Sequence, residues 1–339
     1  MNILHIVPGI CYGGIEQVIL RYTQLTNLSH HVLTLSSEKS SQVDIFKERF
    51  SSVTLNENSN AIAKYIFIYN FIRNKKFDVI HLHLNEMSGV VFTLIKLIDR
   101  KVKIVLHSHN FYRKNQETAY IGINKNITKF VSQKSNCLKF ACTHEAGNWL
   151  FGSNYKLIRN AFYLSDFSPD SEKFRNRVSF IARLEKQKQP LLALDIFNKY
   201  FKKHYQMQFV GNGSLKDIVK EKIQFESDVT ISEPSNNVNV LLSKTDVLLA
   251  PSAYEGLGII VLEAYCSGCI IIISRGYPKD VTNLPGVIVL DTENNIGDDD
   301  ITMIKAMRGE SRILRSQKNQ QYLRSIGYDL KGESFDHYY

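Results

Sequence analysis

Two glutamates, Glu255 and Glu263, stand at the two ends of the apolar segment "EGLGIIVLE". Burying a carboxylate in such a segment is costly unless it has a partner, so both acids are expected to serve a polar ligand. The glycines open an expected helix near 257–267, whose free N–H groups and dipole attract anions. Eight helical residues span roughly 12 Å, which suits a nucleoside diphosphate sugar, with ribose on Glu263 and sugar on Glu255. The expected binding residues of this segment are Glu255, Gly256, Leu257, Gly258 and Glu263.

Two cations, Arg183 and Lys188, follow an apolar run over 177–184 and precede an expected helix over 190–203. Cations in such a loop can bind a diphosphate and stabilise the charge that develops on it as a leaving group. Solvated surface charges would give the same local pattern. Gly211 and Gly213 follow the next apolar run, and they either approach the same ligand or form a plain turn.

Four histidines form two pairs on expected strands, His81 with His83 and His107 with His109. The strand period of two places both members of a pair on one face, near the carboxyl end of the strand. Four imidazoles suggest a metal, but no acidic or thiol ligands accompany them at matching spacing, so we expect no metal site. We expect His81 and His83 to be satisfied strand-end histidines.

The elements that must position these residues alternate between short apolar runs and helical patterns, which predicts parallel sheets with crossover helices. The sequence is polar over 157–176, and this segment is the expected linker. The fold class is therefore α/β, with doubly wound domains over 1–162 and 163–339. Ligands of such sheets bind at the carboxyl ends of the strands, so we expect a cleft between the domains. A return of the chain after about residue 303 to the first domain is left open. The expected strands cover 2–7, 30–37, 77–84, 102–109, 137–143, 177–184, 206–213, 246–252 and 269–274.

The composition, with 44% hydrophobic and 22% charged residues, describes a soluble globular protein. No apolar run is long enough to span a bilayer, and "MNILHIVPGICYGG" lacks the features of a signal peptide, so a cytoplasmic location is expected. Five cysteines, odd in number and sparse, predict no disulfide framework. The Cys266 and Cys269 pair is expected to supply small apolar residues at a helix end.

The net charge of +9 is concentrated in residues 100–140, which carry nine basic side chains and a single acid, Glu117. Such a stretch can bind nucleic acid or an anionic membrane face, or it can be a basic face exposed to solvent. Nothing in it resembles an RNP, KH or helix-turn-helix signature, so a nucleic-acid partner is not expected.

Several segments, in order and spacing, resemble the retaining GT-B glycosyltransferases of family 4. They are "ARLEKQK", "FVGNG" and "PSAYEGLGIIVLEA", the last of which is similar to the E-x7-E element of that family. Upstream, "GGIEQVI", "LHSHN", "ACTHEAGNWLFG" and "IRNAF" resemble the branch that builds bacterial capsule and exopolysaccharide. The resemblance covers about residues 2–290. Ala182 stands where the family usually has Gly, and "RNAF" replaces "NGID"; neither change removes a charged group.

The resemblance implies two Rossmann-like domains that face a central cleft, with an acceptor-side first domain and a second domain that binds the nucleotide sugar. It places Arg183 and Lys188 on the diphosphate, Glu255 on the sugar and Glu263 on the ribose. Gly13 and Gly14 would approach the phosphate or acceptor, and His109, with His107 as the fallback, would lie beside the reacting sugar. The implied catalytic residues are Glu255, His109, Arg183 and Lys188.

The implied reaction is the retaining transfer of a hexosyl unit from a nucleotide sugar, with UDP favoured, to an oligosaccharide or polyprenyl-diphosphate-linked acceptor. No metal or other cofactor is implied, and the D-x-D in "GDDD" at 297–300 is expected to be a solvated helix start. Cations around "ITKFV" (127–131) would rest on anionic headgroups at the inner face of the cytoplasmic membrane. The alternatives are a nucleotide-sugar 2-epimerase of the same architecture and a catalytically silent nucleotide-sugar-binding scaffold protein.

Overall fold

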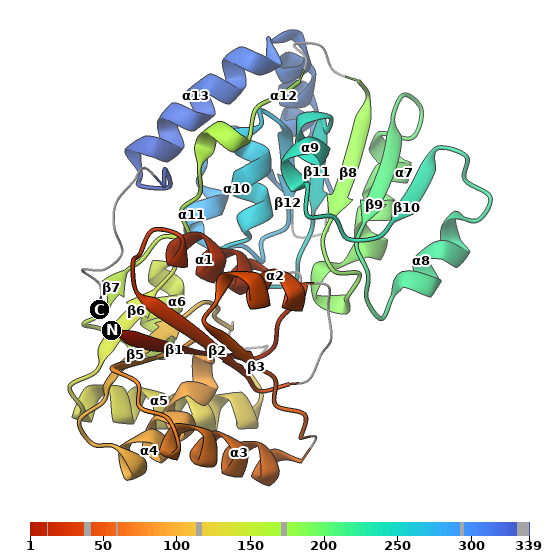
Figure 1. Ribbon diagram of the computed structural model, residues 1–339. Helices are drawn as coiled ribbons and strands as arrows, with labels where there is room; N and C mark the ends of the chain where they lie inside the picture. Colours follow the sequence, from red (N-terminus) through yellow and green to blue (C-terminus); the bar gives the residue numbers. More distant parts are fainter. Residues whose placement is uncertain are drawn as a thin grey trace. The chain divides into compact units, whose positions relative to one another are not determined.

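The computed structural model describes residues 1–11, 13–36, 42–58, 60–112, 117–170, 175–291, 295–330 and 339. They form two compact α/β units (Figure 1). The first unit contains residues 1–160 and Tyr339, and the second begins at Ala161. Both units consist of a parallel sheet with helices packed on it, as the alternating pattern predicts.

The sheet of the first unit has the strand order β3-β2-β1-β4-β5-β6-β7, and every neighbouring pair is parallel. This 3-2-1-4-5-6 order is the Rossmann topology, extended by one short strand. The register sets His5 of β1 beside His81 of β4. The strands are β1 (Asn2–Val7), β2 (Ser29–Thr34), β3 (Ser52–Thr54), β4 (Val79–Leu82), β5 (Lys103–Ser108), β6 (Leu138–Ala141) and β7 (Lys156–Leu157).

Alternate strand residues of this sheet face two different helical layers. Leu4 and Ile80 lie in a core with α3 (Ala61–Arg73) and α4 (Ser88–Ile98), beside which α5 (Ala119–Lys134) packs (Figure 1). Val7 and Val32 lie in another core with α1 (Gly14–Thr23) and α2 (Gln42–Arg49). Because side chains alternate along a strand, His5 shares the face of Val7 and lies on the α1 side of the sheet.

Helix α5 turns polar side chains toward the protein. Its buried residues are Asn124, Thr128 and Ser132. Gly89 of α4 makes this contact possible, because a Cβ there would lie 2.6 Å from the Thr128 backbone. The Gly89 N–H also donates to Thr128 Oγ1 at 2.8 Å, so α4 and α5 are held together by small residues and hydrogen bonds.

The second unit repeats the topology with the strand order β10-β9-β8-β11-β12-β13, again parallel throughout. Apolar runs such as "VLLA" and "IIII" form its fully buried central strands, as expected for a sheet covered on both faces. The strands are β8 (Arg177–Ile181), β9 (Gln206–Val210), β10 (Val229–Ser232), β11 (Val247–Ala250), β12 (Ile270–Ile273) and β13 (Val287–Val289). The helices include α7 (Pro190–Tyr200), α8 (Lys216–Ile223), α9 (Val238–Ser243), α10 (Ile259–Cys266) and α11 (Lys279–Thr282).

The described residues 303–330 all belong to the second unit. Helices α12 (Asp298–Gly309) and α13 (Arg312–Ser325) belong to the second unit, where α13 packs on α10. Arg312, the first residue of α13, attaches this helix to the second unit. It is a fully buried cation that donates to the carbonyl oxygens of Leu242 and Ser243 at 2.7 and 2.9 Å. Tyr339, in contrast, lies in the first unit.

Two minor predictions are confirmed. Asp298 opens α12 directly after its N-cap Gly297, so the D-x-D sequence is a helix start. Cys266 ends α10, and both Cys266 and Cys269 are buried free thiols. Within the described stretches, no helix combines the length and apolar character needed to cross a membrane.

Candidate functional site

Lys188 and Glu255 form an ion pair at the carboxyl edge of the second sheet. Lys188 closes the 3-10 turn η3 (Lys186–Lys188) that follows β8, and Glu255 lies in the loop after the adjacent strand β11. Lys188 Nζ contacts Glu255 Oε1, and the two side chains are only 19% and 8% exposed. The Ser252 hydroxyl donates to the same oxygen at 2.8 Å. The fold thus brings two of the predicted site residues together in a nearly dry environment.

Hydrogen bonds hold the two loops in this position. The Ala253 N–H donates to the Gln187 carbonyl at 2.8 Å, and Gln187 Nε2 donates to the Tyr254 carbonyl at 2.9 Å. The Glu255 N–H donates to the Gly276 carbonyl at 3.0 Å. Backbone hydrogen bonds therefore hold the loop that carries Glu255, and Lys188 contacts its carboxylate.

A small pocket lies against this pair, lined by Ala182, Lys188, Ser252 and Tyr277 among others. Burial and the nearby Glu255 carboxylate hold the pKa of Tyr277 well above its usual value, so the phenol keeps its proton. Gly258 packs against the Tyr277 ring, where a Cβ would lie 2.3 Å from a ring carbon. Its φ of +78° is a second reason for glycine at this position.

Glu263 lies in the second turn of α10 and is 5% exposed. The helix begins only at Ile259, with Gly258 as its N-cap, so Gly256 and Leu257 belong to the loop before it. The estimate of about 12 Å between the two glutamates assumed a continuous helix, and it is therefore wrong for the segment before Ile259.

Arg183 and the G-x-G segment occupy a neighbouring loop pair. Arg183 is exposed after β8 and is absent from the described lining of the small pocket. A Cβ on Gly211 would lie 1.9 Å from the Ala182 carbonyl oxygen, and one on Gly213 would lie 2.6 Å from that of Leu184. Both glycines are thus required by the close approach of two loops, whether or not a ligand contacts them.

Gly13 and Gly14 lie at the start of α1 in the first unit, with Gly13 as its N-cap. A Cβ on Gly13 would lie 2.5 Å from Oε2 of Glu16, which is buried in the first turn of the helix. A carboxylate at a helix N-terminus is favourable. Glu16 Oε1 accepts from the Cys11 N–H at 3.4 Å, so the carboxylate lies beside the turn that precedes the helix. The approach of Gly13 and Gly14 to a phosphate or acceptor stays a prediction.

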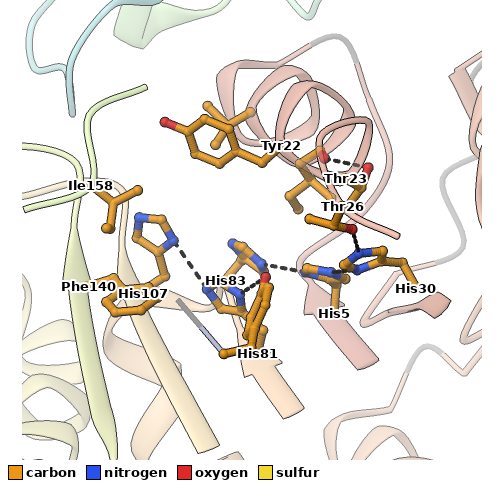
Figure 2. Close-up of a pocket in the computed structure, with 13 residues that line it drawn as sticks. His5, Tyr22, Thr23, Thr26, His30, His81, His83, His107, Phe140 and Ile158 are labelled. Carbon is orange, nitrogen blue, oxygen red and sulfur yellow. Dashed lines mark hydrogen bonds between the residues drawn. The ribbon is translucent and has the colours of Figure 1, made fainter. Parts of the chain in front are cut away.

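The α1 face of the first sheet carries six buried histidines, and all of them except His109 are drawn in Figure 2. His81 contacts Tyr339 through Nδ1 and His107 through Nε2, at 3.0 and 3.2 Å. His83 contacts His5 through Nε2 and His109 through Nδ1, at 3.1 and 2.8 Å. The prediction that His81 and His83 are satisfied is confirmed. The six residues are His5, His30, His81, His83, His107 and His109.

Burial dominates the electrostatics of these rings. It lowers the pKa of His109 to about 3. Burial and the neighbouring histidines hold the pKa values of His5, His81, His83 and His107 well below the usual range. All five rings are therefore neutral at pH 7.

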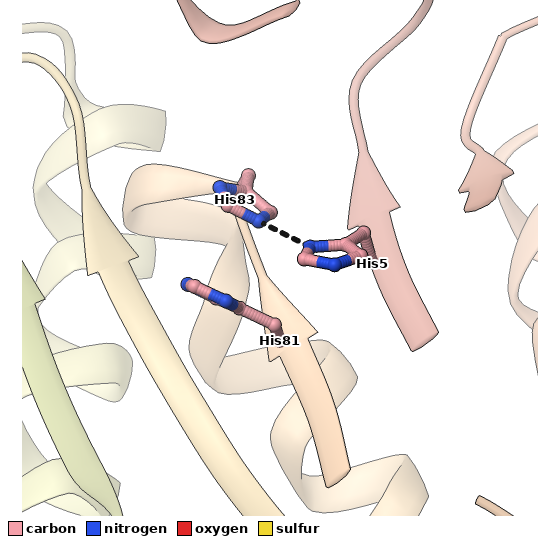
Figure 3. Close-up of side chains that lie close together, drawn as sticks. All are labelled: His5, His81 and His83. Carbon is pink, nitrogen blue, oxygen red and sulfur yellow. Dashed lines mark hydrogen bonds between the residues drawn. The ribbon is translucent and has the colours of Figure 1, made fainter. Parts of the chain in front are cut away.

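Neutral imidazoles are also ligands for transition metals. Among the described residues, two overlapping trios each place one nitrogen per ring within 4.8 Å of the others. They are His5 with His81 and His83 (Figure 3), and His83 with His107 and His109. Both nitrogens of His5, His81 and His83 already have hydrogen-bond partners, which a metal would have to displace. The expectation of no metal stays a prediction.

Several residues of these two sites escaped the sequence analysis. Ser252 lies three residues before Glu255 in the same loop, but its residue type carries no signal of that contact. Tyr277 approaches Glu255 only through the packing of adjacent loops. His5 appears alone on its strand, and His30 is followed directly by His31, so neither shows the period of two that marks the other pairs. Only the sheet register brings them to the cluster.

Comparison with known proteins places these observations in context. The family description "Glycosyl transferases group 1" matches residues 175–296, which contain the Lys188 and Glu255 pair. The chain is 26% identical to an uncharacterised 41.2 kDa protein of the cps region of Klebsiella pneumoniae, over 85% of this chain and 83% of that protein. It is 25% identical to the capsular polysaccharide biosynthesis glycosyltransferase CapH of Staphylococcus aureus, over 81% of each chain.

The structure is also similar to that of Alr3699/HepE from Anabaena in complex with UDP and glucose. The TM-score is 0.74 at 15% identity, over 97% of this chain and 96% of that one. The fold, two parallel-sheet Rossmann-like units, is the GT-B fold.

Proposed function

We propose that the protein is a retaining glycosyltransferase that moves a hexosyl unit from a nucleotide sugar to an oligosaccharide or lipid-linked acceptor in capsular polysaccharide or exopolysaccharide biosynthesis. The observation that carries the proposal is the ion pair of the partly buried Lys188 with the buried Glu255, beside the Ser252 hydroxyl, at the carboxyl edge of the second sheet. Parallel sheets of this topology bind ligands at that edge. UDP is the favoured nucleotide, which the UDP present in the HepE structure supports.

In this proposal Lys188 stabilises the negative charge that develops on the departing diphosphate. Arg183, exposed on the neighbouring loop, adds a second cation. Glu255 orients the donor sugar and Glu263 binds the ribose. The bond between the anomeric carbon and the diphosphate oxygen breaks, and the acceptor oxygen bonds to the same face of that carbon. The acceptor proton passes to the diphosphate, so the reaction needs neither a covalent intermediate nor a metal.

The test is thermal shift of the purified chain with UDP, GDP, ADP and their sugars. A ligand at about 100 times its Kd adds roughly 2.7 kcal/mol of stability. We expect a UDP-selective shift that is lost in Lys188→Met and Glu263→Gln. It should persist in Lys186→Met, a matched control because Lys186 is an exposed lysine in the same turn. No shift with any nucleotide would contradict the donor site.

Product analysis separates the remaining alternatives. Sugar isomerised in an incubation without acceptor would support a 2-epimerase. Nucleotide-sugar binding without turnover, across a panel of polyprenyl-diphosphate and oligosaccharide acceptors, would support a scaffold protein. Transfer with retained anomeric configuration, read by NMR of the product, is the outcome that we expect.

The proposal includes association with the anionic inner face of the cytoplasmic membrane. Helix α5 exposes four large apolar side chains at spacings of three and four residues, which places them on one face. They are Tyr120, Ile123, Ile127 and Phe130, with exposures of 62%, 61%, 38% and 62%. Lys129 and Lys134 lie on the same helix, as charge attraction to anionic lipid requires. Arg113 and Lys114 of the basic stretch lie outside the described residues.

Flotation with liposomes tests this surface. We expect binding to vesicles of phosphatidylglycerol and phosphatidylcholine, and weak binding to phosphatidylcholine alone. Ile123→Ser combined with Phe130→Ser should abolish flotation, whereas Phe225→Ser, at a 91% exposed phenylalanine of the second unit, should not. Equal flotation of both variants would refute the assignment to α5.

A further inference from the structure

A cavity of about 30 Å³ lies on the α1 face of the first sheet (Figure 2). Its lining includes His5, His81 and His83, and one nitrogen from each of these rings lies within 4.8 Å of the other two (Figure 3). The second trio, His83 with His107 and His109, differs because His109 does not belong to the described lining of this cavity. Of the two trios, the first is therefore the one whose three rings line a described cavity together.

The sheet backbone holds the three rings of this trio next to one another. His5 of β1 and His81 of β4 are direct neighbours in the register of two parallel strands. His83 lies two residues further along on the same face, and its N–H donates to the Ile6 carbonyl at 2.9 Å. The rings of His81 and His83 stack with centroids 4.0 Å apart. Three imidazoles are thus presented from adjacent strands, which fix a binding site more precisely than loops do.

The nitrogens of the trio are spaced almost as in a tetrahedral metal site. Two imidazole nitrogens bound to one tetrahedral Zn²⁺, each at about 2.05 Å, are roughly 3.3 Å apart. His5 Nδ1 and His83 Nε2 are 3.1 Å apart. The His81 nitrogen lies within 4.8 Å of the other two, so a side-chain rotation that moves it by at most about 1.5 Å completes the geometry.

The far nitrogens of His5 and His83 already have neighbours that can accept a proton. A histidine that binds a metal keeps its proton on the other nitrogen and donates it to an outer partner. His5 Nε2 lies 2.9 Å from His30 Nδ1, and His83 Nδ1 lies 2.8 Å from His109 Nε2. Between His5 and His83 a metal breaks one hydrogen bond, and it replaces that bond with two metal–nitrogen bonds.

His81 gives up one of its two contacts in the same way. Its Nδ1 contacts the Tyr339 hydroxyl at 3.0 Å, and its Nε2 contacts His107 Nδ1 at 3.2 Å. Whichever nitrogen binds the metal, the other one keeps its outer partner. All three rings can therefore act as ligands without leaving a ring nitrogen unpaired.

We propose that His5, His81 and His83 bind one divalent transition-metal ion, of which Zn²⁺ is the representative, in the first unit. Three imidazoles with no acid or thiol form a sufficient ligand set for zinc. Imidazole nitrogen also selects Zn²⁺, Ni²⁺ and Cu²⁺ over Mg²⁺ and Ca²⁺, which prefer oxygen ligands. The fourth position faces the cavity, which has room for a water molecule and is also lined by Tyr339.

This site departs from the expectation of no metal, which rested on the two histidine pairs of the sequence. His5 belongs to neither pair, and only the register of β1 with β4 adds it to the ligand set. The metal joins these two strands and stabilises the first unit. The site is independent of the proposed function, because Lys188 and Glu255 lie in the second unit.

Titration of chelator-treated protein with Co²⁺ tests the site. Four-coordinate Co²⁺ absorbs visible light much more strongly than six-coordinate Co²⁺. We expect an intense visible band that saturates at one Co²⁺ per chain, that disappears on addition of Zn²⁺ and that persists in Mg²⁺. Zn²⁺ should also raise the urea midpoint read by the fluorescence of Trp149, which lies in the first unit. No intense visible band, or a near-ultraviolet band from thiolate ligands, would overturn the proposal.

Variants identify the ligands. Loss of an outer partner costs roughly 10–100-fold in metal affinity, so His5→Gln, which removes a ligand, should weaken Co²⁺ binding by more than about 100-fold. His107→Gln removes a ligand from the second trio alone and should weaken binding by a smaller factor. His144→Gln, at an exposed histidine outside the cluster, is the control and should leave the affinity unchanged.

The order of these effects decides between the two trios. A larger loss in His107→Gln than in His5→Gln would place the metal elsewhere and overturn the proposal, as would an intact visible band in folded His5→Gln. The urea midpoint of each metal-free variant is measured first, so that loss of folding is not mistaken for loss of a ligand. The Co²⁺ spectrum of the unmodified chain decides the proposal even where a variant does not fold.

Discussion

Mild acid should destabilise the first unit, because its buried histidines have folded-state pKa values far below those of the unfolded chain. Burial lowers the pKa of His109 to about 3 and depresses those of His5, His81, His83 and His107. The unfolded state takes up protons first, as the pH falls through about 6.5. The stability contributed by neutral rings is thus complete above that pH and is lost as the pH falls from there toward the folded values.

The size of the effect follows from the number of rings. His109, with a folded-state pKa of about 3, costs roughly 1 kcal/mol of stability between pH 7.5 and 5.5, because only the unfolded state takes up a proton in that range. Burial also depresses the pKa values of His5, His81, His83 and His107, so their losses add to this one, against a whole stability of about 5–15 kcal/mol for a typical domain. The first unit should therefore lose a large part of its stability as the pH falls from 7.5 to 5.5.

Trp149 makes the measurement selective. It is the single tryptophan of the chain and lies in α6 (His144–Leu150) of the first unit, where its Nε1 donates to Glu117 at 3.2 Å. Its fluorescence during urea unfolding at pH 7.5, 6.5 and 5.5 should show a midpoint that falls steeply below pH 6.5. His144→Gln, at an exposed histidine outside the cluster, should leave that dependence unchanged. A urea midpoint that is constant from pH 7.5 to 5.5 would refute the reasoning.

Two further predictions concern packing and charge. Lys188→Met should destabilise the second unit by about 3 kcal/mol, the low end for a broken buried ion pair, while the double variant with Glu255→Gln should recover most of the loss. Calorimetry checks this, and additive effects of the two substitutions would contradict the coupling. Gly89→Ala should cost about 1–3 kcal/mol by overpacking against the Thr128 backbone. Gly122→Ala should cost much less, because its nearest neighbour is the flexible Glu117 side chain at 3.2 Å; equal Trp149 unfolding midpoints would disprove the difference.

The sequence predicted the long and buried elements well because their patterns are local. "VLLA" and "IIII" are continuous apolar runs, and they became β11 and β12. Four strands were missed, since an edge strand of two to four residues carries too little pattern to separate it from a loop. They are Ser52–Thr54, Lys156–Leu157, Val229–Ser232 and Val287–Val289. Residues 303–325 belong to two helices, α12 and α13, and Ser311 caps the second by accepting from the Leu314 N–H.

The candidate sites were predictable in their parts and not in their connections. Lys188 and Glu255 each stand in a loop after a strand, so each was found, but their ion pair joins loops 67 residues apart. The contacts among the buried histidines depend on the register of four neighbouring strands, which the order of residues along one strand does not contain. Loop packing and strand register are long-range properties. They determine which of the predicted residues contact one another, and the local patterns do not contain this information.

Helix α5 is fully formed, and its attachment to α4 at Gly89 and Thr128 leaves the apolar face outward. Many peripheral segments become helical only when they touch lipid, and the ordering of each residue then opposes adsorption by roughly 1–2 kcal/mol of backbone entropy. In this protein the helix is already ordered when the domain folds, so adsorption does not include that loss of backbone entropy. Adsorption would be a rigid-body step with a rate set by diffusion and charge attraction, and far-UV circular dichroism would not change on addition of vesicles.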